Sequence, residues 1–487
     1  MVAFLAVAAA LCAVLLIALN RSRGRGKRLP PGPKGLPVLG NALDMPTGNL
    51  WTTFTEWGHK YGDIVSITVF GQTIVILNSW AVASELMEKR GALYSDRPKP
   101  LIHKLVNTPA QLEKVLPPEK GLEKHWHRFA KDVLRAPERL DRHIQNAVVS
   151  VLMQVSHGFT PEGVDDPMTV VYGDAMEQFS IVTAPGAFLV DVFPILRYVP
   201  SWMPGTSWKR QAVAYAKTVA DMADIPFLRL KRQITAGTAE PSFGSFNMQG
   251  SALSAEQEHM VKWAATSIYF GGANTTIPTI RLFFLCMTLF PHVQAKAQAE
   301  IDSVLGDALP ALNDRARLPY VDALVKEVFR WNPPAPGAGF RRTTEDDEYK
   351  GYFIPKGAIV IPNVWHFSMT RSAIKTPCLS TRSLYAFRRQ VPEADPRPPC
   401  FGFGRRACPG YTLGEADVFV ACATALALFD ISSPSVGERE TKTSPMSVSP
   451  LELCTYNGSI SHPKPFDCSL KPRNQRVETT ILSLNGD

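Results

Sequence analysis

The sequence has few features of a disulfide-rich, zinc-binding or disordered protein. Its 487 residues include eight cysteines, with no Cys-x-x-Cys pair and no framework spacing, so neither a set of disulfides nor a structural zinc site is expected. Only 20% of the residues are charged and 45% are hydrophobic, and there is no internal repeat and no long low-complexity linker. The soluble part is therefore expected to be one large, mainly α-helical domain with a minor β-sheet.

Basic residues are scarce outside one short cluster. The 52 basic and 44 acidic residues give a formal net charge of +8, and five of these charges lie between Arg21 and Arg28. The rest of the chain has an excess of only three positive charges. This excess is too small to indicate a nucleic-acid-binding face, so no nucleic acid partner is expected.

The first 20 residues contain no charged side chain and read MVAFLAVAAALCAVLLIALN. A helix with a rise of about 1.5 Å per residue spans roughly 28 Å over the nineteen apolar residues before Asn20. Residues 1–20 are therefore expected to form one transmembrane helix. A cleaved signal peptide is the alternative, but such peptides carry positive charge before a shorter apolar core. Here the charge follows the run, which predicts a lumenal N-terminus and a cytoplasmic body.

Proline and basic residues lie between this predicted anchor and the globular part of the chain. Residues 21–40 contain RSRGRGKR and LPPGPKGLPVLGN, which predict a semi-rigid linker before a domain at 41–487. An SH3-type ligand is the alternative interpretation of the prolines. Further on, alternating residues around Gly71 and Gln72 predict a β-hairpin, and helical spacing covers 256–289 and 293–305.

The segment with the most chemistry is FGFGRRACPG at residues 401–410, directly before a long apolar periodic run. Its glycines allow a sharp turn and a close approach to a flat partner, and Pro409 suits the first turn of a helix. Cys408 is therefore expected at a helix N-terminus. There the helix dipole, Arg405 and Arg406 favour a thiolate, the form that binds a metal. A buried small hydrophobe is the simpler interpretation of Cys12, Cys286 and Cys422.

These ten residues fit F-x-x-G-x-R-x-C-x-G, which resembles the heme-binding motif of the cytochrome P450 monooxygenases. The resemblance implies that Cys408 is the axial metal ligand of heme b (iron protoporphyrin IX). It also implies that Arg406 pairs with a heme propionate and that Phe401 covers the sulfur. Gly404 and Gly410 would keep the loop close to the macrocycle.

A second resemblance is Glu327 and Arg330, which fit the E-x-x-R pair of this family. Such a pair also occurs on exposed helices, where it stabilises by only a few tenths of a kcal/mol, so a surface ion pair is the alternative. The resemblance implies a structural pair that braces the cysteine loop. Downstream of it, Arg342 resembles another propionate-binding arginine of the family.

The third resemblance is GGANTT at residues 271–276, which is similar to the oxygen-activation motif of the family. Because glycine inside a helix costs about 1 kcal/mol relative to alanine, two adjacent glycines suggest a widened groove or a close ligand. The resemblance implies catalytic roles for Gly272, Asn274 and Thr275. The family normally has an acidic residue where Asn274 stands, so proton delivery would depend on water and Thr275.

Over most of its length the chain resembles fungal microsomal members of the O-methylsterigmatocystin oxidoreductase type. This resemblance implies a single-pass protein of the endoplasmic reticulum membrane with a cytoplasmic catalytic domain. It implies electrons from NADPH through NADPH–cytochrome P450 reductase, and hydroxylation of a small lipophilic secondary metabolite or xenobiotic.

Two stretches depart from the family pattern. In residues 99–134 the expected W-x-x-x-R is missing. Four residues after Trp126 the chain has Ala130 where the pattern requires arginine, and Arg128 is out of register. In residues 368–389 the expected segment with a third bracing arginine is missing. A reading of Lys375 to Ser383 in another frame, with permitted codons, spells such a segment, which suggests a frame shift; a divergent surface loop is the alternative. The chain is therefore either an active monooxygenase or a defective or non-catalytic heme-binding paralogue, and a membrane-tethered scaffold is a third hypothesis.

Overall fold

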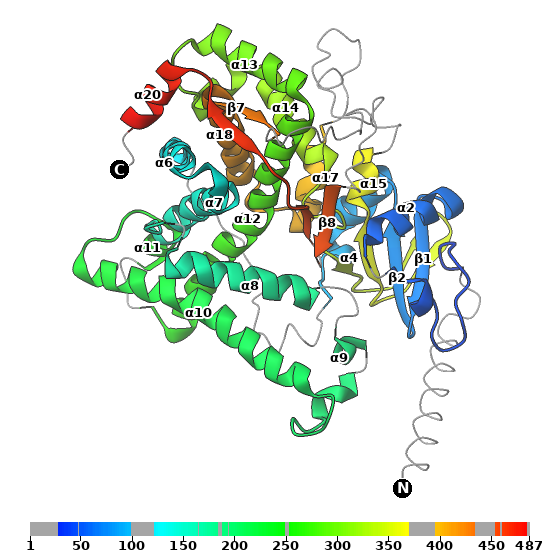
Figure 1. Ribbon diagram of the computed structural model, residues 1–487. Coiled ribbons are helices and arrows are strands. Elements are labelled where there is room, and N and C mark those ends of the chain that lie inside the picture. Colours follow the sequence, from blue (N-terminus) through cyan, green and yellow to red (C-terminus); the bar gives the residue numbers. More distant parts are fainter. Residues whose placement is uncertain are drawn as a thin grey trace. The chain divides into compact units, whose positions relative to one another are not determined.

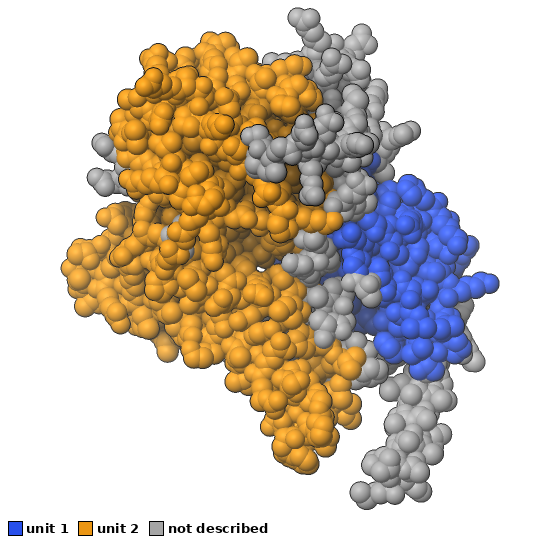
Figure 2. All heavy atoms as spheres, in the orientation of Figure 1, with its two compact units in different colours: residues 1–99, 335–370, 398–407 blue, residues 100–334, 371–397, 408–487 orange. Residues whose placement is uncertain are grey.

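The computed structural model describes residues 28–46, 48–98, 121–163, 165–183, 188–192, 194–248, 253–369, 395–433, 453–457 and 460–484. The predicted anchor at 1–20 and nearly all of the segment 368–389 lie outside these residues. The fold divides into two compact units, coloured in Figure 2. Unit 1 comprises residues 1–99, 335–370 and 398–407, and unit 2 comprises residues 100–334, 371–397 and 408–487.

Unit 1 is built on a small mixed sheet. Its strands β1 (Ile64–Val69), β2 (Gln72–Leu77), β6 (Ile359–Pro362) and β3 (Arg341–Arg342) lie in the order β1-β2-β6-β3. Strands β1 and β2 pair antiparallel with Val69 opposite Gln72, which confirms the predicted hairpin. Strand β6 pairs parallel to β2 and antiparallel to β3. Strands β4 (Asp347–Tyr349) and β5 (Tyr352–Ile354) form a separate pair.

Short helices surround this sheet (Figure 1). They are η1 (Ala42–Asp44), α2 (Leu50–Tyr61), α3 (Trp80–Ser84), the π-helix η2 (Glu85–Lys89), α4 (Gly91–Tyr94), α15 (Val364–Met369), α17 (Arg397–Phe401) and η6 (Gly404–Arg406). Helix α2 packs Leu50 and Phe54 against Val65 and Ile76 of the sheet. The spacing of these two residues places them on one face of the helix, as an amphipathic segment requires.

Unit 2 is mainly helical (Figure 1). Its helices are α6 (Leu122–Arg135), η3 (Pro137–Arg139), α7 (Leu140–His157), α8 (Pro167–Thr183), α9 (Leu189–Val192), η4 (Pro194–Tyr198), α10 (Ser207–Ala236), α11 (Phe243–Met248), α12 (Ala255–Leu289), α13 (Pro291–Leu305), η5 (Leu312–Arg317), α14 (Pro319–Trp331), α18 (Tyr411–Leu428) and α20 (Gln475–Ser483). Strand β7 (Phe429–Ser432) pairs with β10 (Ser469–Pro472), and β8 (Cys454–Asn457) pairs with β9 (Ile460–Pro463). The mainly α fold class with a minor sheet is confirmed.

Local sequence explains the long helix α12. Ser254 and Gln257 form a capping box at its start, because each side chain accepts a hydrogen bond from the other residue's backbone N–H. Pro278 lies inside the helix, and the chain bends by 105° between α12 and α13.

Within the described residues, α18 alone is by itself long and apolar enough to cross a membrane. Of its most apolar stretch, 83% is buried inside the protein. Burial in the core of unit 2 accounts for its apolar sequence.

Candidate functional site

Cys408 lies three residues before α18, as the sequence predicts. Its side chain is exposed. Protein atoms around the sulfur nevertheless desolvate a thiolate and raise the pKa of Cys408, while the backbone N–H of Gly410 acts in the opposite direction. The raised pKa differs from the lowered one expected from the neighbouring arginines and the helix dipole. A bound metal cation would supply the positive charge that stabilises the thiolate.

The loop before the cysteine is held against the core of unit 1. Gly404 has a φ of +53°, and a Cβ on it would overlap the carbonyl oxygen of Met87, so only glycine fits. Phe403 is buried, and its ring lies edge-on to Phe367 at 6.3 Å between centroids. Phe401 ends helix α17 immediately before this turn. The path of the loop is thereby fixed at Gly404 and just before it.

Three arginines of unit 1 come together beside this loop. They are Arg97, which follows α4, Arg341 of β3 and Arg406 of η6. The Nη2 of Arg341 donates to the carbonyl oxygen of Arg406 at 3.2 Å, and the Nε of Arg406 donates to the carbonyl oxygen of Ser95 at 2.9 Å. Arg341 is only 3% exposed, and its Nη1 has no hydrogen-bond partner among the described residues. Burial, followed by repulsion from Arg97 and Arg406, lowers the pKa of Arg341 to about 9.

This cluster fits the carboxylates of the heme that the resemblance implies. A buried guanidinium with a free donor and two cationic neighbours is unfavourable until an anion joins it. Burial and then Arg406 also lower the pKa of Arg97. A propionate among these arginines would accept hydrogen bonds and remove their repulsion.

Arg342, the residue that the sequence suggests for this role, lies elsewhere. Its side chain is 44% exposed, and its Nε lies 3.7 Å from Oδ2 of Asp96. Successive residues of a strand point to opposite faces of the sheet, so Arg341 and Arg342 cannot both face the cluster. The structure brings Arg341 to the cluster instead.

Helix α12 carries the second predicted group of site residues. A Cβ on Gly272 would lie 2.6 Å from Cδ2 of Leu152 on α7, whereas a Cβ on Gly271 would meet open space. Gly272 therefore allows close packing of two helices, which differs from the catalytic role suggested by the sequence. Thr275 lies one turn after Gly271, and its hydroxyl donates to the Gly271 carbonyl oxygen at 3.2 Å. Asn274 is 7% exposed.

The Glu327 and Arg330 pair is buried rather than superficial. These residues are 0% and 1% exposed, and the Nε of Arg330 donates to Oε2 of Glu327 at 2.9 Å. Arg330 has further interactions besides this one. The surface ion-pair alternative is therefore wrong, because both groups lie in the core of unit 2.

A neighbouring charge network was missed by the sequence analysis. Glu415 on α18 is 6% exposed and pairs with both Arg315 and Arg397. Arg315 also pairs with Asp322 of α14 at 2.7 Å. The network joins Arg397, the first residue of α17, to α18, which follows Cys408, and to α14, which carries Glu327 and Arg330.

Trp126 and Arg128 are engaged in other contacts of unit 2. The indole Nε1 of Trp126 donates to Oδ1 of Asp417 on α18 at 2.8 Å, and both side chains are buried. Arg128 donates to the carbonyl oxygen of Glu162 at 2.5 Å. These hydrogen bonds use donors that the W-x-x-x-R pattern would offer to a propionate. Arg128 does not replace the missing arginine in this structure.

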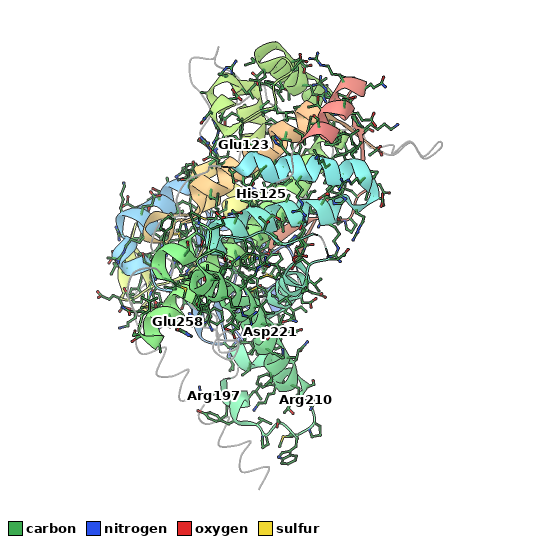
Figure 3. All side chains as sticks on the ribbon, turned by 90° about the vertical axis from the view of Figure 1, so that its left-hand side faces the viewer. Glu123, His125, Arg197, Arg210, Asp221 and Glu258 are labelled. Carbon is green, nitrogen blue, oxygen red and sulfur yellow. The ribbon has the colours of Figure 1, made fainter. Side chains whose placement is uncertain are left out.

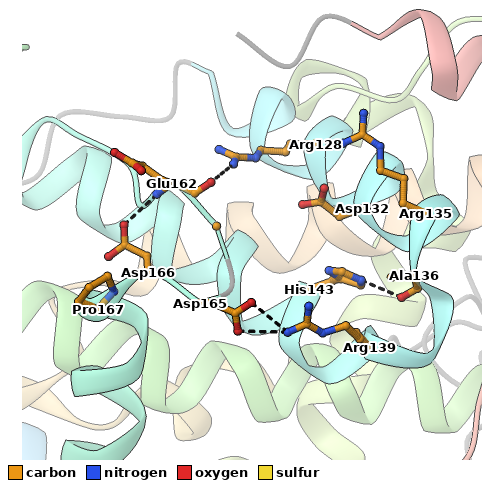
Figure 4. A pocket seen from close by; sticks show the side chains of 11 residues that line it. Arg128, Asp132, Arg135, Ala136, Arg139, His143, Glu162, Asp165, Asp166 and Pro167 are labelled. Carbon is orange, nitrogen blue, oxygen red and sulfur yellow. Dashed lines mark hydrogen bonds and ion pairs between the residues drawn. The ribbon is translucent and has the colours of Figure 1, made fainter.

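Arg128 also lines a charged surface pocket of about 600 Å³ between α6, α7 and the loop before α8 (Figure 4). Arg139 pairs there with Asp165 at 3.1 Å, and Nε2 of His143 lies 2.8 Å from the carbonyl oxygen of Ala136. Its remaining lining residues are Asp132, Arg135, Glu162, Gly163, Asp166 and Pro167. One acid–base pair, Arg139 with Asp165, and a hydrogen bond from Arg128 to the Glu162 carbonyl oxygen tie its walls together, which is typical of a structural surface. Elsewhere among the described ranges, no three His, Cys, Asp or Glu side chains converge to hold a metal ion.

Comparison with known proteins places the chain in a family. The sequence model of the family described as cytochrome P450 matches residues 30–129 and 122–455. The two matched parts overlap at the start of α6, so the match is interrupted within the stretch 99–134 where the W-x-x-x-R pattern is missing.

Several fungal proteins are similar over nearly their whole length. Cytochrome P450 monooxygenase 208 of Postia placenta is 41% identical, and the alignment covers 97% of each chain. Cytochrome P450 monooxygenase claR of Ampulloclitocybe clavipes is 38% identical over 95% of this chain and 90% of the relative. Tryptamine 4-monooxygenase of Psilocybe cyanescens is 32% identical over 95% and 96%, respectively.

Proposed function

The chain belongs to the cytochrome P450 monooxygenase family, and on that premise we propose that it hydroxylates a small lipophilic compound, a secondary metabolite or a xenobiotic. Family membership implies a heme cofactor, which supplies the activation of dioxygen when it is bound. The observation that carries the proposal is the buried cluster of three arginines in unit 1, one of which, Arg406, stands two residues before Cys408 in the chain.

Each residue of the proposed site has a definite task. Cys408 is the thiolate ligand of the iron, and Arg97, Arg341 and Arg406 hold the propionates. Arg341 takes the role that the sequence suggests for Arg342, because its buried Nη1 has no partner in the part of the chain that the structure describes. Phe401 and Gly410 bound the loop on either side of the sulfur.

On α12, Gly271 and Thr275 lie one turn apart on the face where a Cβ on Gly271 would meet open space. The Thr275 hydroxyl donates to a backbone carbonyl at 3.2 Å and is therefore available to accept and pass on a proton. Asn274 is an amide and cannot ionise, so proton delivery depends on Thr275 and water. Gly272 serves packing against Leu152.

The setting of the reaction is also a proposal. Residues 1–20 anchor the chain in the endoplasmic reticulum membrane, with the domain at 41–487 in the cytoplasm. The hydrophobicity of this run and the positive charge after it support this orientation. Electrons then come from NADPH through NADPH–cytochrome P450 reductase in the same membrane.

A defective heme-binding paralogue is the second candidate function. It is favoured by Trp126 and Arg128, whose donors are committed to Asp417 and Glu162, and by the interrupted family match. The frame-shift hypothesis for 368–389 belongs to this alternative. Codons across this segment that are incompatible with the second reading frame would contradict it.

One spectroscopic experiment separates these candidates. The full chain is purified in detergent, and its carbon monoxide difference spectrum is measured after reduction, together with that of Cys408→Ala. The active candidate predicts a thiolate-type Soret band in the parent and its loss in the variant. Cys468→Ala, at a half-buried thiol, is the matched control and should keep the band. A parent that retains little heme, or that binds heme without a thiolate-type band, favours the defective paralogue, and an unchanged band in Cys408→Ala contradicts the ligand assignment.

A further inference from the structure

Helix α12 has one face that the protein leaves partly open. We call it the open face; its members lie on one side of the helix at spacings of three and four residues, are not buried, and comprise Trp263, Ser267, Phe270, Gly271 and Thr275. The opposite side carries Ala265, Tyr269 and Thr276, which are buried. A Cβ on Gly271 would meet nothing within 4 Å. The middle of the open face therefore has room for a bound group.

The open face carries no charge. The sequence contains no charged residue at 263–280. Charged residues nearer the start of α12 pair with α10 instead. The Nζ of Lys262 lies 2.6 Å from Oδ1 of Asp224, and Glu258, which Figure 3 shows near the start of α12, pairs with Lys231. Because nothing on the open face could neutralise an ion, the part of a ligand that lies against it should be uncharged.

Two hydroxyl groups give the open face its polarity. The hydroxyl of Ser267 donates to the carbonyl oxygen of Trp263 at 2.7 Å, and that of Thr275 donates to the carbonyl oxygen of Gly271 at 3.2 Å. Because each hydroxyl proton is used within the helix, each oxygen keeps the capacity to accept a hydrogen bond. The open face therefore suits a ligand that carries a hydrogen-bond donor.

A pair of phenylalanine rings borders the open face. Phe270 and Phe179 of α8 have ring centroids 4.9 Å apart and planes at 86°, and both rings are only partly buried. A second ring contact, between Tyr172 and Tyr269 at 4.9 Å, holds α8 beside α12. Such an edge-to-face pair favours contact with a further aromatic ring. Next to Phe270, the bare backbone of Gly271 allows a flat ring to come close.

We propose that the substrate is a small, uncharged, flat aromatic compound that carries an O–H or N–H donor. Its ring system lies over Gly271 against Phe270 and Phe179, and its donor bonds to Ser267. Ser267 and Thr275 are eight residues apart, about 12 Å along the helix axis, so the donor and the reacting atom belong to opposite ends of the compound. This inference rests on the proposed function, in which Thr275 passes the proton, and it narrows the lipophilic substrate to one chemical class.

Three ligands with one carbon skeleton test the proposal. β-Naphthol is flat and has a donor, its methyl ether is flat and has none, and its fully saturated analogue keeps the donor but is neither flat nor aromatic. Calorimetric titration of the full chain in detergent measures the Kd of each ligand. The parent should bind β-naphthol about tenfold more tightly than either analogue. Equal affinity for β-naphthol and the saturated analogue overturns the aromatic class.

Ser267→Ala tests the recognition of the donor. The variant should lose the preference for β-naphthol over its methyl ether and keep the parent's affinity for the ether. Thr266→Val is the matched control, because its hydroxyl donates to the carbonyl oxygen of Lys262 at 2.8 Å in the same way but is 2% exposed on the buried side. The control should keep the preference. Equal loss in the two variants, or in neither, overturns the role of Ser267.

Gly271→Leu tests the position of the ring. The added side chain fills the open space over the helix, so β-naphthol and its ether should both bind at least about tenfold more weakly. The melting temperature should not fall, because leucine is a good helix former and meets no neighbour at its Cβ. Unchanged affinity for the two ligands overturns the proposal.

The carbon monoxide difference spectrum of the same preparation separates this inference from the proposed function. If the parent has a thiolate-type band but binds the three ligands equally or not at all, the substrate class is wrong and the proposed function stands. If the parent lacks the band and still binds the ligands with the expected preferences, the monooxygenase proposal fails and the open face stands as a site for flat aromatic donors. If the parent shows neither the band nor the preferences, both fail.

Discussion

At the scale of single residues, Asp417 is the least expected group in the core. It is 2% exposed, and burial raises its pKa to about 7, although the hydrogen bond from Trp126 acts in the opposite direction. A carboxyl group with a raised pKa binds a proton in the folded chain at pH values where the unfolded chain has released it. Its contribution to stability is therefore complete below the unfolded pKa near 3.8 and is lost as the pH rises through about 7.

Asp417→Asn tests this linkage. The amide oxygen can still accept the hydrogen bond from Trp126, but it never becomes charged. The parent should lose stability as the pH rises from about 4 to about 7, by on the order of 4 kcal/mol at most for a shift of about three pKa units. The variant should melt higher than the parent at pH 8 and show a flatter pH profile, measured by thermal unfolding of the full chain. Glu478→Gln, at an exposed carboxyl group, is the control, and the same flattening there would contradict the assignment.

Single residues also differ in how well their positions could be predicted from the sequence. Cys408 was placed correctly before its helix, because ten consecutive residues define that loop. Arg341 was not chosen over Arg342, because neighbouring strand residues differ only in the face they occupy, which depends on pairing with β6. Asp417 and Glu415 were missed because a carboxylate on an apolar helix gives no sign of a partner from α6 or η5 until the helices pack.

At the scale of elements, helix α12 places two glycines that look equivalent in the sequence, Gly271 and Gly272, in different surroundings. The hairpin, α12, α13 and the Glu327 helix were predictable from local periodicity, which needs only neighbours in the chain. The packing face of each glycine was not, because it depends on α7. Gly271 faces open space, and Gly272 faces Leu152 at a distance too short for an added methyl group.

A matched pair of substitutions tests this division. Gly271→Ala should stabilise unit 2 by up to about 1 kcal/mol, because alanine is the better helix former and the added methyl meets nothing. Gly272→Ala should destabilise it by about 1 to 3 kcal/mol, because Leu152 must move in a packed interface. Thermal unfolding of heme-free protein measures both changes. Leu152→Ala in the Gly272→Ala background should recover part of the packing loss, and equal effects of the two glycine variants would refute the packing role.

At the scale of the whole molecule, heme binding and folding are expected to be linked. A ligand that binds only the folded chain stabilises it in proportion to the logarithm of its concentration. The arginine cluster makes this linkage specific. In heme-free protein, Arg341 is a buried cation with a free donor, and its pKa is lowered to about 9 by burial and by two other arginines. With propionates present, the same charge becomes a partner in a buried ion pair.

Arg341→Met should therefore change stability in opposite directions in the two states. Without heme, the variant should be more stable than the parent by about 2 to 4 kcal/mol, because a buried uncompensated charge is replaced by an apolar side chain of similar length. With heme, it should be less stable and should release the cofactor faster, because a propionate loses its buried partner. The measurements are melting temperatures with and without heme and the rate of heme transfer to an acceptor protein. Arg342→Met provides the matched control one position along the strand, where the side chain is 44% exposed, and it should change neither state by more than about 1 kcal/mol. If Arg342→Met releases heme faster and Arg341→Met does not, the propionate site lies on the other face of β3, where the sequence alone placed it.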